Sequence, residues 1–105
     1  MENFSYYTDL QLVRCYQQTK NQAYFSELYE RLYPKVYQQC LGIVQIKEIA
    51  YEITEATFLH LSLVIPELGN VKIFFSYLID RVNEACTTAF LEMKNKDKEH
   101  ASVVR

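Results

Sequence analysis

Apolar residues recur at steps of three and four along most of the chain, which is the spacing of one face of an α-helix. The longest example lies between residues 22 and 44, where two neighbouring apolar stripes predict a helix packed between other helices. The stripes consist of Phe25, Leu28, Leu32, Val36, Cys40 and Ile43, and of Tyr29, Tyr33, Tyr37 and Leu41. Pro34 interrupts this segment, and an interior proline removes one backbone hydrogen bond. The sequence therefore predicts either one helix kinked between residues 30 and 34 or two helices in near-continuity.

Three further segments have helical spacing, and no segment has the alternation typical of a β-strand. The first covers residues 8–18, with Thr8 as its N-cap and Asp9 in its first turn, where a negative charge suits the helix dipole. The next covers residues 47–65 and is ended by the turn-forming stretch PELGN. The last begins with Asn70 as its N-cap and continues for about 25 residues. Its apolar positions are Val71, Phe74, Leu78, Val82, Ala85, Ala89 and Met93.

These segments predict an all-α fold, a compact bundle of four main helices. The length of 105 residues is enough for one domain with one hydrophobic core. Half of the residues are hydrophobic and only 2 Gly and 2 Pro occur, so long helices with short loops are favoured over disorder. The expected core residues are Phe25, Leu28, Leu32, Ile53, Leu61, Leu78 and Val82.

The stretch EIAYEITEATFLHL has two distinct faces when it is wound as a helix. Its apolar face consists of Ile49, Ile53, Thr57, Leu61 and Val64. A separate stripe consists of Glu48, Glu52, Glu55, Leu59 and Leu63. No lysine or arginine lies four residues after any of these glutamates to support it with an ion pair. An acidic stripe that continues into leucines favours a docking surface for a basic, partly apolar partner over an ordinary solvated face.

The three cysteines, Cys15, Cys40 and Cys86, are far apart and show no CxxC spacing. This disfavours a disulfide framework and a zinc site, and we interpret them as small buried side chains in a reducing cytoplasm. We expect no signal peptide, because no basic segment is followed by an apolar run near the N-terminus. We also expect no membrane-spanning segment, because no apolar run is long enough.

Charge and motif content argue against catalysis and against strong, independent DNA binding. The formal net charge is −2, and residues 70–100 carry equal numbers of acids and bases. There is no phosphate-binding glycine loop, HExxH motif or nucleophile elbow. His60 is interpreted as a partly buried histidine with a satisfied ring. The three glutamates lack the matching acids and histidines that a metal site between helices requires, so we expect no enzyme activity, cofactor or metal.

Four stretches of the sequence, in their order and spacing, resemble the second conserved region of bacterial RNA polymerase sigma factors, closest to the extracytoplasmic-function class. They are TDLQLV, YFSELYERLYPKVYQQCLGIV, EIAYEITEATFLHL and IPELGNVKIFFSYL, and the similarity covers about residues 8–94. The resemblance implies a cytoplasmic, all-helical domain over residues 1–95, with residues 96–105 as a tail or the start of an interdomain linker. Such domains dock on the clamp helices of the largest polymerase subunit and help to open and read promoters.

The resemblance also implies two sets of site residues. The residues expected to bind the polymerase core are Glu48, Glu52, Glu55 and Leu59. The family pattern of acid, glutamine and acid is changed here to Glu52, Glu55 and Ala56. The residues expected to contact promoter DNA are Lys72, Phe74, Tyr77 and Arg81. Because neighbouring acids cancel the bases, we expect weak binding to single-stranded DNA, with a base stacked on Phe74 or Tyr77.

Further partners follow from the two main interpretations. If the chain is a sigma-factor domain, an anti-sigma factor is a partner that the family implies. The alternative is a diverged sigma-like module that has lost promoter reading and serves protein interaction or regulation. Such a module would act as a decoy or regulator, or as a homodimer through Leu59, Leu63 and Val64. A small helical enzyme has almost no support in the sequence.

Overall fold

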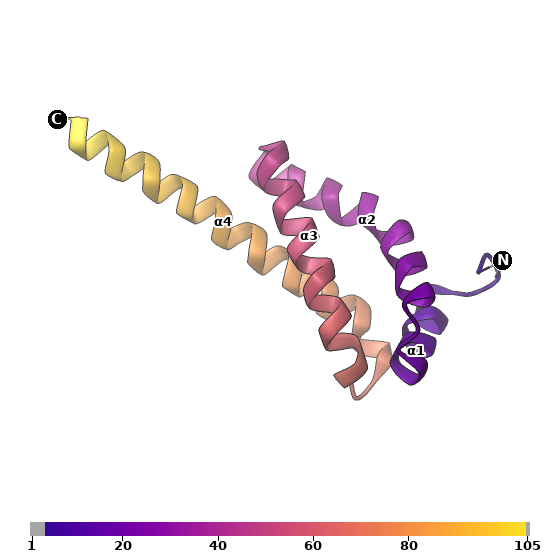
Figure 1. Ribbon diagram of the computed structural model, residues 1–105. Coiled ribbons are helices and arrows are strands. Elements are labelled where there is room, and N and C mark those ends of the chain that lie inside the picture. The colour runs from indigo at the N-terminus through magenta and orange to yellow at the C-terminus, as the bar shows by residue number, and fades with distance from the viewer. Residues whose placement is uncertain (1–3, 105) are drawn as a thin grey trace.

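Four α-helices make up most of the molecule, and the second contacts each of the other three. The computed structural model describes the backbone of residues 4–104 and the side chains of residues 4–95. The helices are α1 (Asp9–Thr19), α2 (Gln22–Val44), α3 (Lys47–Val64) and α4 (Phe74–Val104), and the 3-10 turns η1 (Ile65–Glu67) and η2 (Val71–Ile73) join α3 to α4. No strand occurs between residues 4 and 104, so the predicted all-α bundle of four main helices is confirmed (Figure 1).

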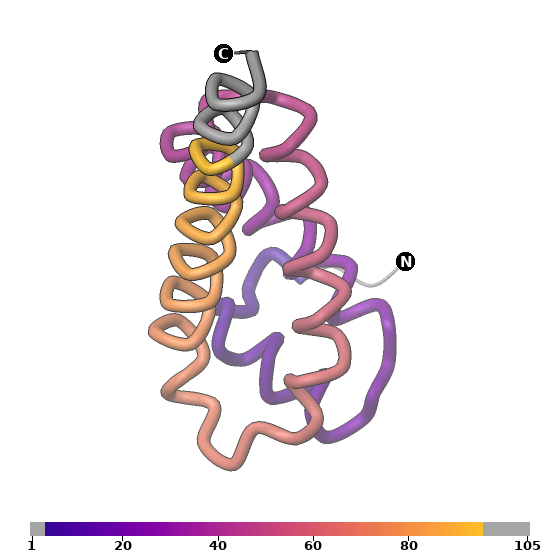
Figure 2. Tube along the Cα trace, turned by 90° about the vertical axis from the view of Figure 1, so that its left-hand side faces the viewer, coloured from indigo at the N-terminus to yellow at the C-terminus, as the bar shows by residue number. Residues whose placement is uncertain are grey.

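Helices α3 and α4 run side by side in opposite directions (Figures 1 and 2), and α1 holds the connection between them. The hydroxyl of Tyr16 on α1 donates a hydrogen bond of 3.0 Å to the carbonyl of Ser62. The amide of Gln17 donates to the carbonyls of Ile65 and Leu68. These bonds give hydrogen-bond partners to carbonyls at the end of α3 and in the connection, where the regular helical bonds run out.

The first helix begins and ends as its sequence predicts. The Thr8 hydroxyl accepts a hydrogen bond from the Gln11 amide, and the Gln11 side chain accepts one from the Thr8 amide, which completes a capping box. Lys20 adopts a left-handed conformation with φ of 57° and ends α1. Asn21 then caps α2, since its side chain accepts from the amide of Ala23.

Helix α2 is one continuous element with Pro34 inside it, so the single-helix alternative is confirmed. An interior proline costs roughly 3 kcal/mol in a helix. The burial of Leu32 and Val36 on either side contributes about 1.5–3 kcal/mol for each side chain and offsets that cost. Figure 1 shows α2 as a curved ribbon, as expected where a hydrogen bond is missing.

The core forms largely from the predicted residues, but α3 is rotated relative to the prediction. Five of the expected core residues are buried, whereas Phe25 and Ile53 are only half-buried. The buried face of α3 consists of Ala50, Thr54, Thr57, Phe58 and Leu61. The predicted apolar face, which included Ile49 and Val64, is therefore wrong in part. Thr54 and Thr57 tolerate burial because each hydroxyl donates to the carbonyl four residues earlier, at 2.7 Å.

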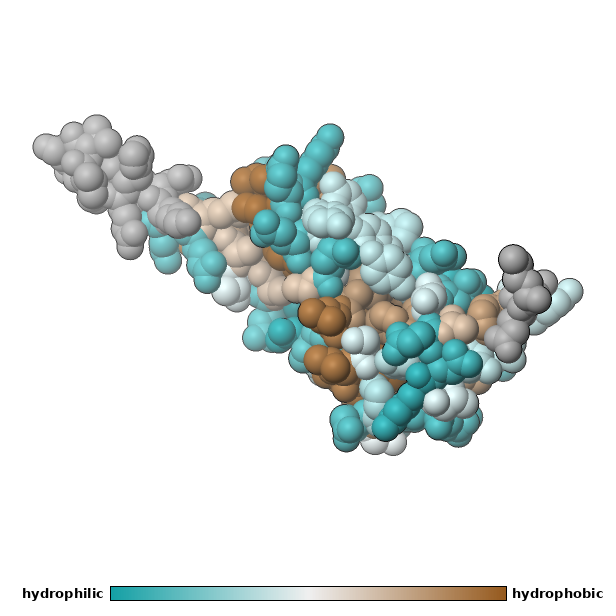
Figure 3. Space-filling view, in the orientation of Figure 1, coloured by the Kyte–Doolittle hydropathy of each residue, from teal (hydrophilic) through white to brown (hydrophobic). Residues whose placement is uncertain are grey.

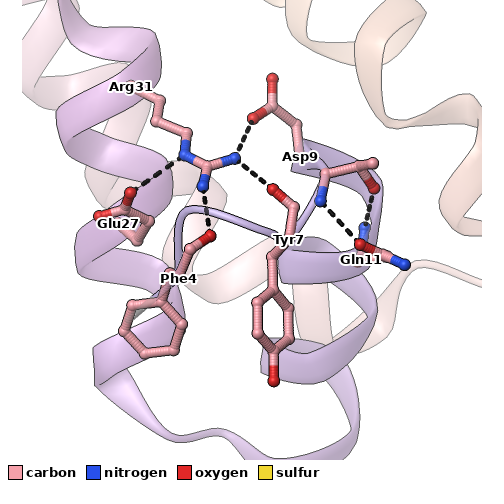
Figure 4. A network of polar contacts seen from close by, with 7 residues as sticks. Phe4, Tyr7, Asp9, Gln11, Glu27 and Arg31 are labelled. Carbon is pink, nitrogen blue, oxygen red and sulfur yellow. Dashed lines mark hydrogen bonds and ion pairs between the residues drawn. The ribbon is translucent and has the colours of Figure 1, made fainter. Parts of the chain in front are cut away.

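Arg31 on α2 ties the segment before α1 to the bundle (Figure 4). Its guanidinium donates to the carbonyls of Phe4 and Tyr7, both at 2.7 Å. It also pairs with Asp9 at 3.2 Å and with Glu27 at 3.1 Å. Partial burial alone would lower the pKa of Arg31, but the bonds to the two carboxylates outweigh it and the pKa lies above its ordinary value.

The last helix starts later and runs further than predicted. Asn70 caps the turn η2 by accepting from the amide of Lys72, and α4 itself begins at Phe74. The helix was expected to end near residue 94, but its backbone stays helical to Val104. Ala89 and Met93 are the last described side chains that pack on the core. The division at residue 95 stays a prediction, and the side chains of residues 96–105 lie outside the described part.

All three cysteines were predicted to be buried, which is confirmed for Cys40 and Cys86 and is wrong for Cys15. Cys40 on α2 and Cys86 on α4 are fully buried, whereas Cys15 is half-buried, and all three are free thiols. Burial, followed by hydrogen bonding with Cys40, raises the pKa of Cys86 to about 12. The Cys86 thiol therefore stays protonated at neutral pH and behaves as a small apolar side chain.

Candidate functional site

The acidic and leucine stripe lies on the outer face of α3, opposite its buried residues. Glu48 and Glu52 are exposed, and Leu59 and Leu63 are 68% and 70% exposed. Figure 3 shows hydrophobic surface beside hydrophilic surface along the course of α3. The sequence therefore placed these four side chains correctly off the core, and Leu59 and Leu63 are among the most exposed large apolar residues described.

Glu55 differs from the other two glutamates because it is held by tyrosines. The Tyr29 hydroxyl on α2 donates a hydrogen bond of 2.7 Å to one Glu55 oxygen, and the Tyr51 hydroxyl donates one of 3.3 Å to the other. The bond to Glu55, followed by partial burial, raises the pKa of Tyr29 to about 12. Glu55 is thus half-buried between two helices, unlike the exposed Glu48 and Glu52, and its role in binding the polymerase core stays a prediction. The sequence contains no local signal for the bond from Tyr29, which lies 26 residues from Glu55, whereas Tyr51 lies four residues before Glu55 on the same helix.

Glu48 and Glu52, by contrast, have no hydrogen bond or ion pair with any described residue. The ion pairs among residues 4–95 all involve Arg31, which pairs with Asp9 and Glu27. The two carboxylates lie four residues apart, so they sit on adjacent turns of one helix face. Like charges at this spacing weakly destabilise a helix, and a basic partner would relieve that repulsion.

A groove between α2 and the first half of α3 adds aromatic rings to these carboxylates. It has a volume of about 630 Å³ and is lined by Tyr33, Tyr37, Lys47, Glu48, Tyr51 and Glu52. The rings of Tyr33 and Tyr37 are nearly parallel, with an interplanar angle of 8° and centroids 6.3 Å apart. Burial, and then the negative charge of Glu55, raise the pKa of Tyr33. The sequence signal for this groove is the tyrosine stripe of residues 29–37, although its spacing alone predicts only an apolar helix face.

The four residues expected to contact DNA differ in exposure. Phe74 is 0% exposed and packs in the core, so its ring cannot stack on a base in this fold, and that expectation is wrong. Tyr77 is half-buried, and its hydroxyl lies 2.6 Å from Nε2 of His60. The two rings also lie nearly parallel, at 13°. Lys72 and Arg81 are exposed, nine positions apart along the chain.

The predicted environment of His60 is confirmed, because the side chain is partly buried and its ring nitrogen is hydrogen-bonded to the hydroxyl of Tyr77.

Among the described residues, no group of three or more His, Cys, Asp or Glu side chains could hold a metal ion. No helix in the described part of the chain combines the length and apolar character needed to cross a membrane. Val64, the third residue of the expected dimer surface, is half-buried.

Comparison of the chain with models of protein families, with curated proteins and with solved structures gives no match in any of the three.

Proposed function

We propose that this chain is a sigma-factor region-two-like domain that binds the RNA polymerase core in the cytoplasm. The observation that carries the proposal is the exposed row of Glu48, Glu52, Leu59 and Leu63 on α3. That row coincides with the helix that docks on the polymerase clamp in the family that the sequence resembles. Unpaired carboxylates next to exposed leucines suit a partner helix that offers both basic and apolar side chains.

Promoter DNA is the weaker partner in this proposal. Residues 70–100 have balanced charge, so phosphate neutralisation adds little affinity. Because Phe74 is buried, Tyr77 is left as the stacking residue, with Lys72 and Arg81 supplying charge. The ring of Tyr77 must separate from the ring of His60 before a base can stack on it. The domain would therefore assist promoter opening only when polymerase holds single-stranded DNA nearby. An anti-sigma factor would compete with the polymerase core for the exposed face of α3.

The exposure of Leu59 and Leu63 also favours a second candidate function. Two such leucines at i and i+4 on two copies of α3 could pack together, which would make the chain a homodimeric regulatory module. Val64 would add little to that interface, because it is already half-buried.

One titration separates the two functions. The purified chain is titrated with an isolated clamp-helix fragment of the largest polymerase subunit, at low and at physiological salt. The proposal predicts saturable binding that weakens with salt. Absence of binding, together with a dimer in sedimentation that Leu63→Glu converts to a monomer, would establish the alternative instead.

A further inference from the structure

We infer that the groove lined by Tyr33, Tyr37, Lys47, Glu48, Tyr51 and Glu52 captures an arginine side chain of the protein that docks on α3. The inference deepens the proposed function and rests on it in one respect, namely that α3 binds a protein. It adds a site that the acidic stripe alone does not contain, because three of the six groove residues are tyrosines and two of these come from α2.

The charge of the groove selects a cation. Two carboxylates and one ammonium group line it, and the carboxylates of Glu48 and Glu52 have no partner among the described residues. The Glu55 carboxylate lies against Tyr29 and Tyr51 and adds further negative charge close by. An anionic ligand would meet repulsion here, whereas a positive group replaces the missing ion pairs.

The aromatic rings select guanidinium over a simple metal ion. A cation near the face of a tyrosine ring is attracted by the ring quadrupole, and the planar guanidinium also stacks on it. The same group can donate two parallel hydrogen bonds to one carboxylate. Tyr51 is 53% exposed, and its bond to Glu55 holds it at the groove edge, so Glu55 acts as a positioning residue.

The surroundings of the groove indicate that this arginine belongs to a protein. The groove is open to solvent, and the same face of α3 continues from Glu52 to Leu59 and Leu63. At 1.5 Å per residue, Leu59 lies roughly 10 Å beyond Glu52 along the helix axis. A partner segment with an arginine about two helical turns from an apolar side chain would meet both features at once.

The probe that tests the groove is N-acetyl-L-arginine amide, with N-acetyl-L-citrulline amide as its neutral analogue of nearly equal shape. Binding is followed by NMR through the ring resonances of the tyrosines. We expect saturable shifts of the groove tyrosines at roughly millimolar concentration and clearly weaker binding of the citrulline compound. Tyr51→Leu and Glu52→Gln should each weaken the arginine probe about two- to fivefold.

Tyr6→Leu is the matched control, because Tyr6 is 90% exposed and lines a different hollow. It should leave the binding of the arginine probe unchanged. Equal binding of both probes, or unchanged binding in Tyr51→Leu and Glu52→Gln, would overturn the inference. If clamp helices bind and the arginine probe does not, the groove inference fails while the proposed function survives. If the probe binds and clamp helices do not, the groove stands and its partner is another basic protein.

Discussion

Tyr29 and Glu55, which are 26 residues apart on α2 and α3, are joined by a hydrogen bond of 2.7 Å from the phenol to the carboxylate. The bond divides the acidic stripe into two parts with different roles. Glu55 belongs to the packing between two helices, while Glu48 and Glu52 face solvent without a partner. A change at Glu55 therefore affects both fold and binding, and a clean test of binding must use the other two glutamates.

The same bond predicts how stability depends on alkaline pH. The folded pKa of Tyr29 is raised from 10.0 to about 12, so the bond stabilises the fold fully below pH 10. That contribution is lost as the pH rises from 10 toward 12, because the phenolate can no longer donate to Glu55. Tyr29→Phe should be less stable than the wild type at neutral pH and should lose less stability over this range. Denaturant unfolding at several pH values measures both, and parallel curves for the two proteins would contradict the prediction.

Arg31 should contribute far more to stability than an exposed arginine. Arg31→Met removes four hydrogen bonds and leaves the carboxylates of Asp9 and Glu27 without their cation, so we expect a loss of about 2 kcal/mol. Arg14→Met is the control, since Arg14 is exposed on α1 and its loss should stay within about 0.5 kcal/mol. Equal unfolding free energies for the two variants would show that the network adds nothing.

Phe74 and Tyr77 should separate folding from DNA binding. Phe74→Ala opens a cavity in the core and should cost about 3–5 kcal/mol of stability. Tyr77→Leu removes the proposed stacking ring together with the bond to His60, and its cost should be nearer 1 kcal/mol. Only Tyr77→Leu should then lose single-stranded DNA binding while still folded. If Phe74→Ala stays folded and no longer binds DNA, the prediction is contradicted and Phe74 contacts DNA itself.

Thiol labelling should distinguish the three cysteines. With an aromatic disulfide reagent at neutral pH, the native protein should react at Cys15 alone, because Cys40 and Cys86 are fully buried. All three should react in denaturant, and Cys15→Ser should remove the native reaction. Rapid labelling of Cys86 in the native state would mean that α2 and α4 separate more readily than their packing indicates.

Helical spacing and capping residues were enough to predict the four helices, but not the rotation of α3 about its axis. Ala50 and Thr54 are buried on α3 because small residues allow close approach to α2, yet neither counts as strongly apolar in a periodic pattern. The contact of Tyr29 with Glu55 depends on how two helices cross, which no local pattern contains. For Phe74, apolar spacing had already placed the ring in the buried stripe, and it was the resemblance that assigned the ring to DNA.

The most direct test of the central claim is the affinity of the clamp-helix fragment for Glu48→Lys with Glu52→Lys. The matched control is Asp80→Lys with Glu84→Lys, which makes the same charge change at the same spacing on exposed positions of α4. We predict that the α3 variant loses on the order of a few kcal/mol of binding free energy, that the α4 variant does not, and that both melt like the wild type. Unchanged clamp binding in a folded α3 variant, or equal losses in the two variants, would contradict this prediction.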